Sequence, residues 1–110
     1  MPHYLIQVSY TEQAWQALIK NPQDRIEAVR PAIENLGGKI QEGWFAFGDC
    51  DVVCIAELPD NVAAAAISMA FSAGGACKNV KTTPLMSTAE GIEALKKASR
   101  VGYRSATAGA

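Results

Sequence analysis

The sequence predicts an α+β domain in which strands and helices alternate, and three observations carry this prediction. Residues 3–10 alternate between apolar and mixed positions with a period of two, which is typical of a strand with one buried face. Residues 44–58 hold two apolar runs on either side of Gly48–Asp51, a pattern typical of two strands joined by a tight turn. Apolar residues at helical spacing fill the segments before and after this hairpin.

The composition is that of a small globular protein. The 110 residues are 49% hydrophobic and 19% charged, with a net charge of -1, so nothing attracts the chain generally to nucleic acid or anionic lipid. The longest uncharged stretch, residues 62–77, is shorter than the roughly 18–20 apolar residues of a membrane span. The first residues lack the basic and apolar regions of a signal peptide. We therefore expect a cytoplasmic protein with no nucleic-acid or membrane partner.

The first part of the chain is expected to hold one strand and two helices. The strand covers residues 3–10, and the first helix ends before Pro22, because a residue that precedes proline disfavours helical geometry. Asn21 is expected to cap the second helix, with Pro22 at its first position. Pro31 is expected to kink that helix, and Gly37–Gly38 ends it.

The middle of the chain is expected to form a hairpin from strands at residues 39–47 and 51–58. With a turn of two or four residues, Phe47 pairs with Val52, and the aromatic residues Phe45 and Phe47 share the face of Val52. A turn of three residues would instead exchange the two faces of one strand.

The last part of the chain is expected to hold a helix, a strand and a final helix. The first of these, at residues 62–73, is rich in alanine, and the strand at 79–86 contains Pro84, which favours an edge position. The segment Ser87-Thr88-Ala89-Glu90 is a capping box that starts the final helix. Its residues Ile92 and Leu95 are expected to point inward.

This order, β-α-β-β-α-β with an extra C-terminal helix, predicts a ferredoxin-like sandwich with helices on one face of an antiparallel sheet. One domain is expected over residues 1–104, followed by a flexible tail at 105–110. The other face of the sheet is too apolar to leave in water, and no remaining element is long enough to cover it. We therefore expect a homodimer with two sheets packed face to face. The expected interface residues are Leu5, Gln7, Trp44, Val53 and Ile55.

Five short motifs are spaced along residues 3–104. They are Tyr4-Leu5-Ile6, Leu36-Gly37-Gly38-Lys39, Phe47-Gly48-Asp49-Cys50-Asp51-Val52-Val53, Pro59-Asp60-Asn61 and Asn79-Val80-Lys81-Thr82. In this order and spacing they resemble the GYD domain family. Gly48 and Asp51 match the segment that gives the family its name, whereas Cys50 stands where tyrosine is usual. The resemblance implies a dimeric α+β barrel, a superfamily that includes cofactor-free monooxygenases, haem-degrading enzymes, isomerases and proteins with no known activity.

Few side chains indicate catalysis. His3 is the only histidine, which argues against a Ser-His-Asp triad and a multi-histidine metal site. Asp49 and Asp51 lie in a predicted turn, where both are expected to ionise and neither to act as a general acid. The odd number of cysteines, without a CxxC pair, argues against disulfides and zinc; they are Cys50, Cys54 and Cys77. Four cations could gather to hold an anion or could face solvent: Lys78, Lys81, Arg100 and Arg104.

Aromatic residues supply the candidate ligand site. Tyr10, Trp15 and Trp44 could line a cleft between sheet and helices that holds a flat apolar ligand, and core packing is the alternative. We predict a non-catalytic binding or assembly module without a cofactor or metal. The alternative is a cofactor-free enzyme, similar to a monooxygenase or an isomerase, that acts on an aromatic or polyketide-like substrate in that cleft.

Overall fold

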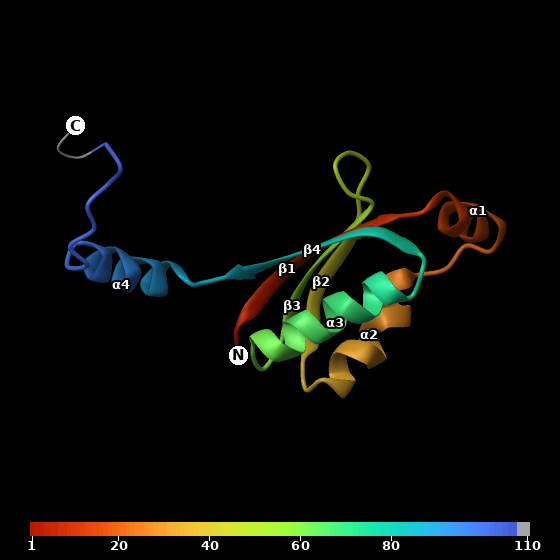
Figure 1. Ribbon diagram of the computed structural model, residues 1–110. Helices are drawn as coiled ribbons and strands as arrows, with labels where there is room; N and C mark the ends of the chain where they lie inside the picture. The colour runs from red at the N-terminus through yellow and green to blue at the C-terminus, as the bar shows by residue number, and fades with distance from the viewer. Residues whose placement is uncertain (108–110) are drawn as a thin grey trace.

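Four strands and four helices make up the part of the chain that the computed structural model describes, residues 1–107 (Figure 1). In chain order they are β1 (His3–Tyr10), α1 (Glu12–Lys20), α2 (Arg25–Asn35), β2 (Lys39–Phe45), β3 (Val52–Glu57), α3 (Asn61–Ala73), β4 (Cys77–Leu85) and α4 (Thr88–Ala98). The predicted α+β class is confirmed, with one antiparallel four-stranded sheet.

The sheet has the order β2-β3-β1-β4, so β1 and β3 are central and β2 and β4 are its edges. In the central pair Leu5 lies opposite Ile55 and Gln7 opposite Val53. On the other side of β1, Pro84 of β4 lies opposite Tyr4. Proline at this edge costs little, because the missing N–H removes no bond from the interior of the sheet.

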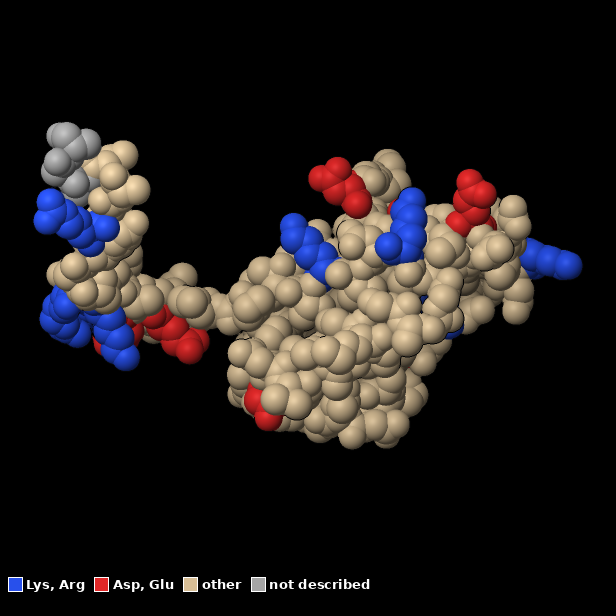
Figure 2. Space-filling model, in the orientation of Figure 1, with Lys and Arg blue, Asp and Glu red and all other residues tan. Residues whose placement is uncertain are grey.

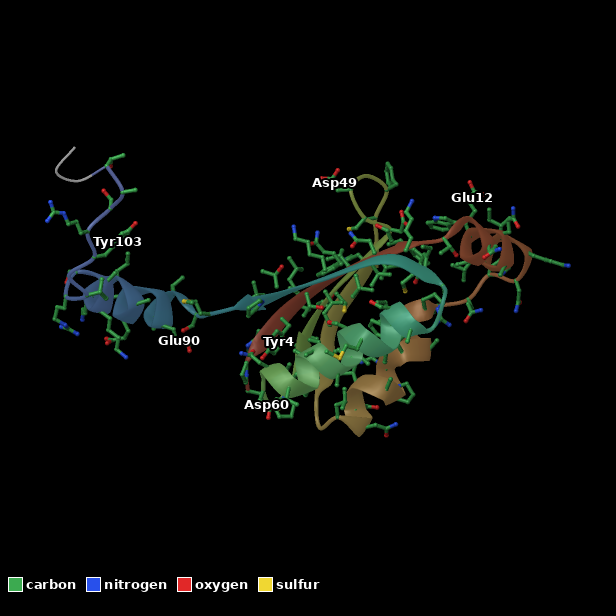
Figure 3. The ribbon with its side chains drawn as sticks, in the orientation of Figure 1. Tyr4, Glu12, Asp49, Asp60, Glu90 and Tyr103 are labelled. Atoms are coloured by element: carbon green, nitrogen blue, oxygen red, sulfur yellow. The ribbon has the colours of Figure 1, made fainter. Side chains whose placement is uncertain are left out.

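The core lies between the sheet and the helices α2 and α3, which cover the same face (Figure 1). Even-numbered residues of β1 and β3 point into it, as the period of two predicts. The buried apolar residues are Tyr4, Ile6, Val8, Tyr10, Ile33, Ile40, Val52, Cys54, Ala56, Leu58, Ala63, Ala64 and Ile67. Tyr4 lies between the sheet and α3 (Figure 3), and its hydroxyl donates a 2.7 Å hydrogen bond to Oδ1 of Asn61.

The second helix begins later than predicted. Asp24, not Asn21, is the N-cap of α2, and its Oδ1 accepts hydrogen bonds from the backbone N–H groups of Ile26 at 3.0 Å and Glu27 at 3.2 Å. A carboxylate beside two free N–H groups satisfies the helix start and suits the helix dipole. Pro22 therefore lies in the connection between α1 and α2, and α2 continues through Pro31 to its end.

The loop of the hairpin is longer than predicted, and the pairing of its two strands is shifted by two residues. β2 ends at Phe45, which lies opposite Val52, while Phe47 is fully exposed in the loop of residues 46–51. Asp51 is held by β1 instead of by a tight turn, because its N–H donates to the carbonyl of Val8 and its own carbonyl accepts from Ala46. A shift of two residues leaves Trp44 and Phe45 on their predicted faces, whereas Phe47, predicted to share the face of Val52, lies outside the sheet.

The final helix is capped as predicted but is not packed on the sheet. Ser87 and Glu90 form the capping box, whereas Ile92 and Leu95 are 53% and 71% exposed, so the expected inward orientation is wrong. Figure 1 shows α4 at the end of an arm that leaves the body after β4. The radius of gyration is 17.8 Å, against about 13 Å for a compact chain of this length.

Residues 105–107, the last that the structure describes, are exposed and form no helix or strand. The rest of the predicted tail, residues 108–110, lies outside the described residues. Among residues 1–107, no helix combines the length and the apolar character that a membrane crossing requires.

Candidate functional site

The face of the sheet opposite α2 and α3 carries the five residues expected at an interface. Leu5 and Ile55 face each other across β1 and β3, and Gln7 faces Val53. Trp44 of β2 lies opposite Val53 and is 50% exposed. No helix of residues 1–107 covers this surface, which we call the open face (Figure 1). The structure therefore brings these five side chains onto one continuous, mostly apolar surface.

Charged residues border one end of the open face. Glu57 Oε1 lies 3.5 Å from Nε2 of His3, and its Oε2 lies 3.8 Å from Nζ of Lys39. The hairpin loop closes the other end, where Nε2 of Gln7 donates a 3.9 Å hydrogen bond to Sγ of Cys50. The apolar centre is thus framed by polar groups, as in many protein–protein interfaces.

A second candidate site lies on the other side of the sheet. A narrow cavity of about 60 Å³ opens between the sheet and the helices. Its lining is apolar apart from Tyr10, Arg25 and two thiols, and the complete lining is Ile6, Val8, Tyr10, Arg25, Ile26, Val29, Val52, Cys54, Phe71, Ala76 and Cys77. At this volume the cavity is far smaller than the roughly 300–1,000 Å³ of ligand pockets, so by itself it has no room for a ligand larger than a few water molecules.

Burial and the Arg25 guanidinium act in opposite directions on the ionisable groups of this cavity. Burial raises the pKa of Tyr10, and the nearby Arg25 lowers it in part. Burial also raises the pKa of Cys77, again opposed by Arg25. Cys54 has no such cation beside it, and burial raises its pKa to about 11. All three groups therefore stay protonated near neutral pH, and none is an activated nucleophile.

A wider groove of about 660 Å³ runs along the outer side of β2 and shares Arg25, Ile26 and Val52 with the cavity. Trp44 and Phe45 belong to this groove. Here α2 packs so closely on β2 that a Cβ added at Gly43 would lie only 2.5 Å from Cδ1 of Ile26.

The three aromatic residues expected to bind a ligand fall at different places. Tyr10 lines the narrow cavity, and Trp15 packs on it edge to face, with ring centroids 5.5 Å apart and an interplanar angle of 87°. Trp44 lines the groove instead. Arg25 lines both spaces but was not among the residues predicted from the sequence. The predicted start of the helix at Asn21 placed Arg25 inside the helix, whereas it is the first residue after the observed cap, Asp24.

The polar residues considered for catalysis do not form a site. Asp51 Oδ2 accepts a 2.8 Å hydrogen bond from the backbone N–H of Tyr10, and Asp49 projects from the hairpin loop away from the sheet (Figure 3). Lys78 and Lys81 belong to β4, whereas Arg100 follows α4 on the arm, where positive charge is concentrated (Figure 2). Residues 1–107 contain no group of three His, Cys, Asp or Glu side chains that could hold a metal ion.

The sequence profile of the GYD domain matches residues 4–95, which includes all four strands and most of α4. The chain belongs to the GYD domain family. No curated protein sequence matches it. The family description states no activity. Membership of the GYD family therefore identifies the type of domain, and a function has to be inferred from the geometry of the surface. The match reaches Leu95, so the first two turns of the arm helix are part of the GYD domain.

Proposed function

We propose that this GYD protein is a cytoplasmic homodimeric binding or assembly module with a ferredoxin-like fold. Two copies pack their open faces together and form a dimeric α+β barrel. The observation that carries the proposal is the open face itself, where Leu5, Val53 and Ile55, each partly exposed, form an apolar centre over which no helix of residues 1–107 lies. Exposed apolar surfaces of this kind are typical of interaction sites.

A second copy of the chain fits this surface better than an unrelated partner. The sheet order β2-β3-β1-β4 is that of a ferredoxin-like sandwich, and the barrel arrangement implied by the GYD resemblance packs two such sheets by their free faces. A twofold axis through the face places the same apolar centre on both sides of the contact. The acid–base pairs of Glu57 then lie at the rim, where they stay hydrated.

The test is native mass spectrometry of the purified chain and two variants. Wild type is expected at twice the mass of one chain at micromolar concentration, and Ile55→Asp at one. Val62→Asp is the matched control, because Val62 is an exposed apolar residue on α3, away from the open face, and should leave the dimer intact. A monomeric wild type, or a dimer that Ile55→Asp leaves unchanged, would contradict the proposal.

One observation favours a second candidate function. The narrow cavity, with Tyr10 and Arg25 in its wall, shares Arg25 with the groove of about 660 Å³ along β2. Only the groove has the volume of a ligand pocket, roughly 300–1,000 Å³. The two spaces together support a cofactor-free enzyme or binding protein for a small aromatic or polyketide-like molecule, held in the groove with its anionic group at Arg25.

Native mass spectrometry of protein purified without denaturation would detect such a molecule as a non-covalent adduct. Arg25→Ala should abolish an adduct held by an anionic group, and Arg30→Ala should retain it. Arg30 is the matched control, because it also lines the groove but is paired with Glu27 at 2.9 Å and does not line the narrow cavity.

A further inference from the structure

The helix α4 lacks support from its own chain. None of its 11 residues is buried, and isolated helices shorter than about 12–15 residues are marginal in water. The capping box satisfies backbone groups at its first turn only. A helix with these properties needs a surface on which to pack.

The arm exposes a series of apolar side chains that could make such a contact. Ile92 and Leu95 are three positions apart and therefore lie on the same side of α4. Exposed apolar residues also precede and follow the helix, and the series is Leu85, Met86, Ile92, Leu95, Val101 and Tyr103. Tyr103 lies on this arm, well away from the body, whereas Glu90 lies nearer the base of the arm (Figure 3).

The base of the arm is continuous with the open face. His3 and Ile55 of the sheet share one hollow with Met86 and Glu90 of the arm. A body seated on the open face therefore also meets the arm where it leaves the sheet.

The charges of arm and body are complementary. Residues 86–110 carry four Lys or Arg and two Asp or Glu, a net charge of +2, whereas residues 1–85 carry six and nine, a net charge of -3. After Leu95 the chain carries four cations and no acidic residue; the cations are Lys96, Lys97, Arg100 and Arg104. Figure 2 shows positive charge gathered at the end of the arm. An acidic surface on another copy would attract it.

Of the two sheet edges, β2 suits the arm. The β4 edge carries Lys78 and Lys81, which repel the cations of the arm. The groove along β2 exposes Phe45, which is 61% exposed and lies on the other face of the strand from Trp44. Its charged residues are Asp24, Arg25, Glu27, Arg30 and Glu42. Arg30 is paired with Glu27, and Arg25 donates a 2.8 Å hydrogen bond to Gln23.

We propose that α4 docks on the β2 edge of a second copy, so that two copies exchange their arms. Ile92 and Leu95 pack on Phe45 of the groove, and the cations that follow lie beside its acids. This inference rests on the proposed homodimer and adds to it a second contact, which the sheets alone do not make. The arm then lengthens the interface beyond the open face and ties each copy to the outer strand of the other.

Amide hydrogen–deuterium exchange of the full chain tests the inference, with native mass spectrometry of the same samples to report the dimer. Exchange of residues 88–98 should be slow in the dimer and at least about tenfold faster once dilution gives the monomer. Fast exchange within an intact dimer would overturn the arm contact and leave the face-to-face dimer standing. Slow exchange in the monomer would mean that the arm packs on its own chain. A chain that never dimerises would overturn the proposed function and this inference together.

Variants identify the surface. Leu95→Asp should accelerate exchange of α4 in the dimer at least about tenfold, whereas Ala94→Asp, which places the same charge outside the stripe, should change it little. Phe45→Asp on the β2 edge should reproduce the effect of Leu95→Asp. Lys78→Glu on the β4 edge should not, and the opposite result for these two edges would overturn the assignment to β2.

Discussion

The backbone N–H of Tyr10 donates a 2.8 Å hydrogen bond to the carboxylate of Asp51, which joins the end of β1 to the hairpin loop. The N–H of Asp51 in turn donates to the carbonyl of Val8. Asp51 thus holds the loop against the central strand at the border of the open face. Asp51, which matches the segment that gives the GYD family its name, therefore has a structural role. Its exposed neighbour Asp49 does not.

Asp51→Ala should therefore destabilise the protein by about 1–2 kcal/mol, because a backbone N–H near the core loses its charged acceptor. Urea unfolding followed by tryptophan fluorescence measures the change. Asp49→Ala is the matched control and should change the free energy of unfolding by less than about 0.5 kcal/mol. Equal effects of the two substitutions would mean that the loop is not held by Asp51.

Gly38→Ala should destabilise the fold by about 1–3 kcal/mol through overpacking. A Cβ at this position would lie 2.3 Å from the carbonyl oxygen of Glu57 and 2.7 Å from Cδ2 of Leu58. Gly48→Ala is the control, because nothing lies within 4 Å of the added atom. It should be neutral or slightly stabilising. Thermal unfolding of both variants decides the matter, and a tolerated Gly38→Ala would contradict the close contact between the start of β2 and the end of β3.

The raised pKa of Cys54 predicts a loss of stability at alkaline pH. Burial raises this pKa from 9.0 to about 11, so the folded state keeps the thiol proton that the unfolded chain releases. The stabilisation is complete below pH 9 and is lost as pH rises from about 9 to about 11, by at most about 3 kcal/mol. Urea unfolding across this range, compared with Cys54→Ala, isolates the contribution of the thiol. Parallel curves for the two proteins would show that Cys54 does not titrate in this way.

The capping box makes α4 sensitive to acid. Hydrogen bonds from the backbone N–H and side chain of Ser87 lower the pKa of Glu90. A lowered carboxylate pKa stabilises the helix above the ordinary pKa and ceases to do so as pH falls through the lowered value. Backbone chemical shifts of residues 88–98 should therefore move toward random-coil values on acidification, and Ser87→Ala should produce such a change at neutral pH. Unchanged helical shifts in both cases would mean that another contact holds the first turn.

Periodicity predicted the faces of the sheet because burial on one side of a strand leaves a period of two in the sequence. The even-numbered residues of β1 are buried, as the pattern of residues 3–10 indicates. The ends of the helices were harder to predict. Asn21 and Asp24 are both good N-caps, and only the folded chain selects between them. The hairpin register depended on the contact of Asp51 with β1, which local turn propensities do not encode.

The candidate site was only partly visible in the sequence. The open face followed from alternation in β1 and β3, whereas Arg25 entered the cavity through a tertiary contact of α2. For α4, the spacing of Ile92 and Leu95 predicted that both point inward. The structure shows that the body of the same chain does not bury them. The predicted inward orientation is therefore wrong, and the proposed exchange of arms gives these two residues a partner in a second copy.

The central claim is that the open faces of two copies contact each other, and isotope-filtered NOE spectroscopy tests it most directly. A mixed sample of ¹³C-labelled and unlabelled chains, 11.7 kDa each, restricts the signals to contacts between copies. Intermolecular NOEs are expected among the side chains of Leu5, Val53, Ile55 and Trp44. A dimer whose intermolecular NOEs come instead from α2 and α3, with none from the open face, would contradict the claim.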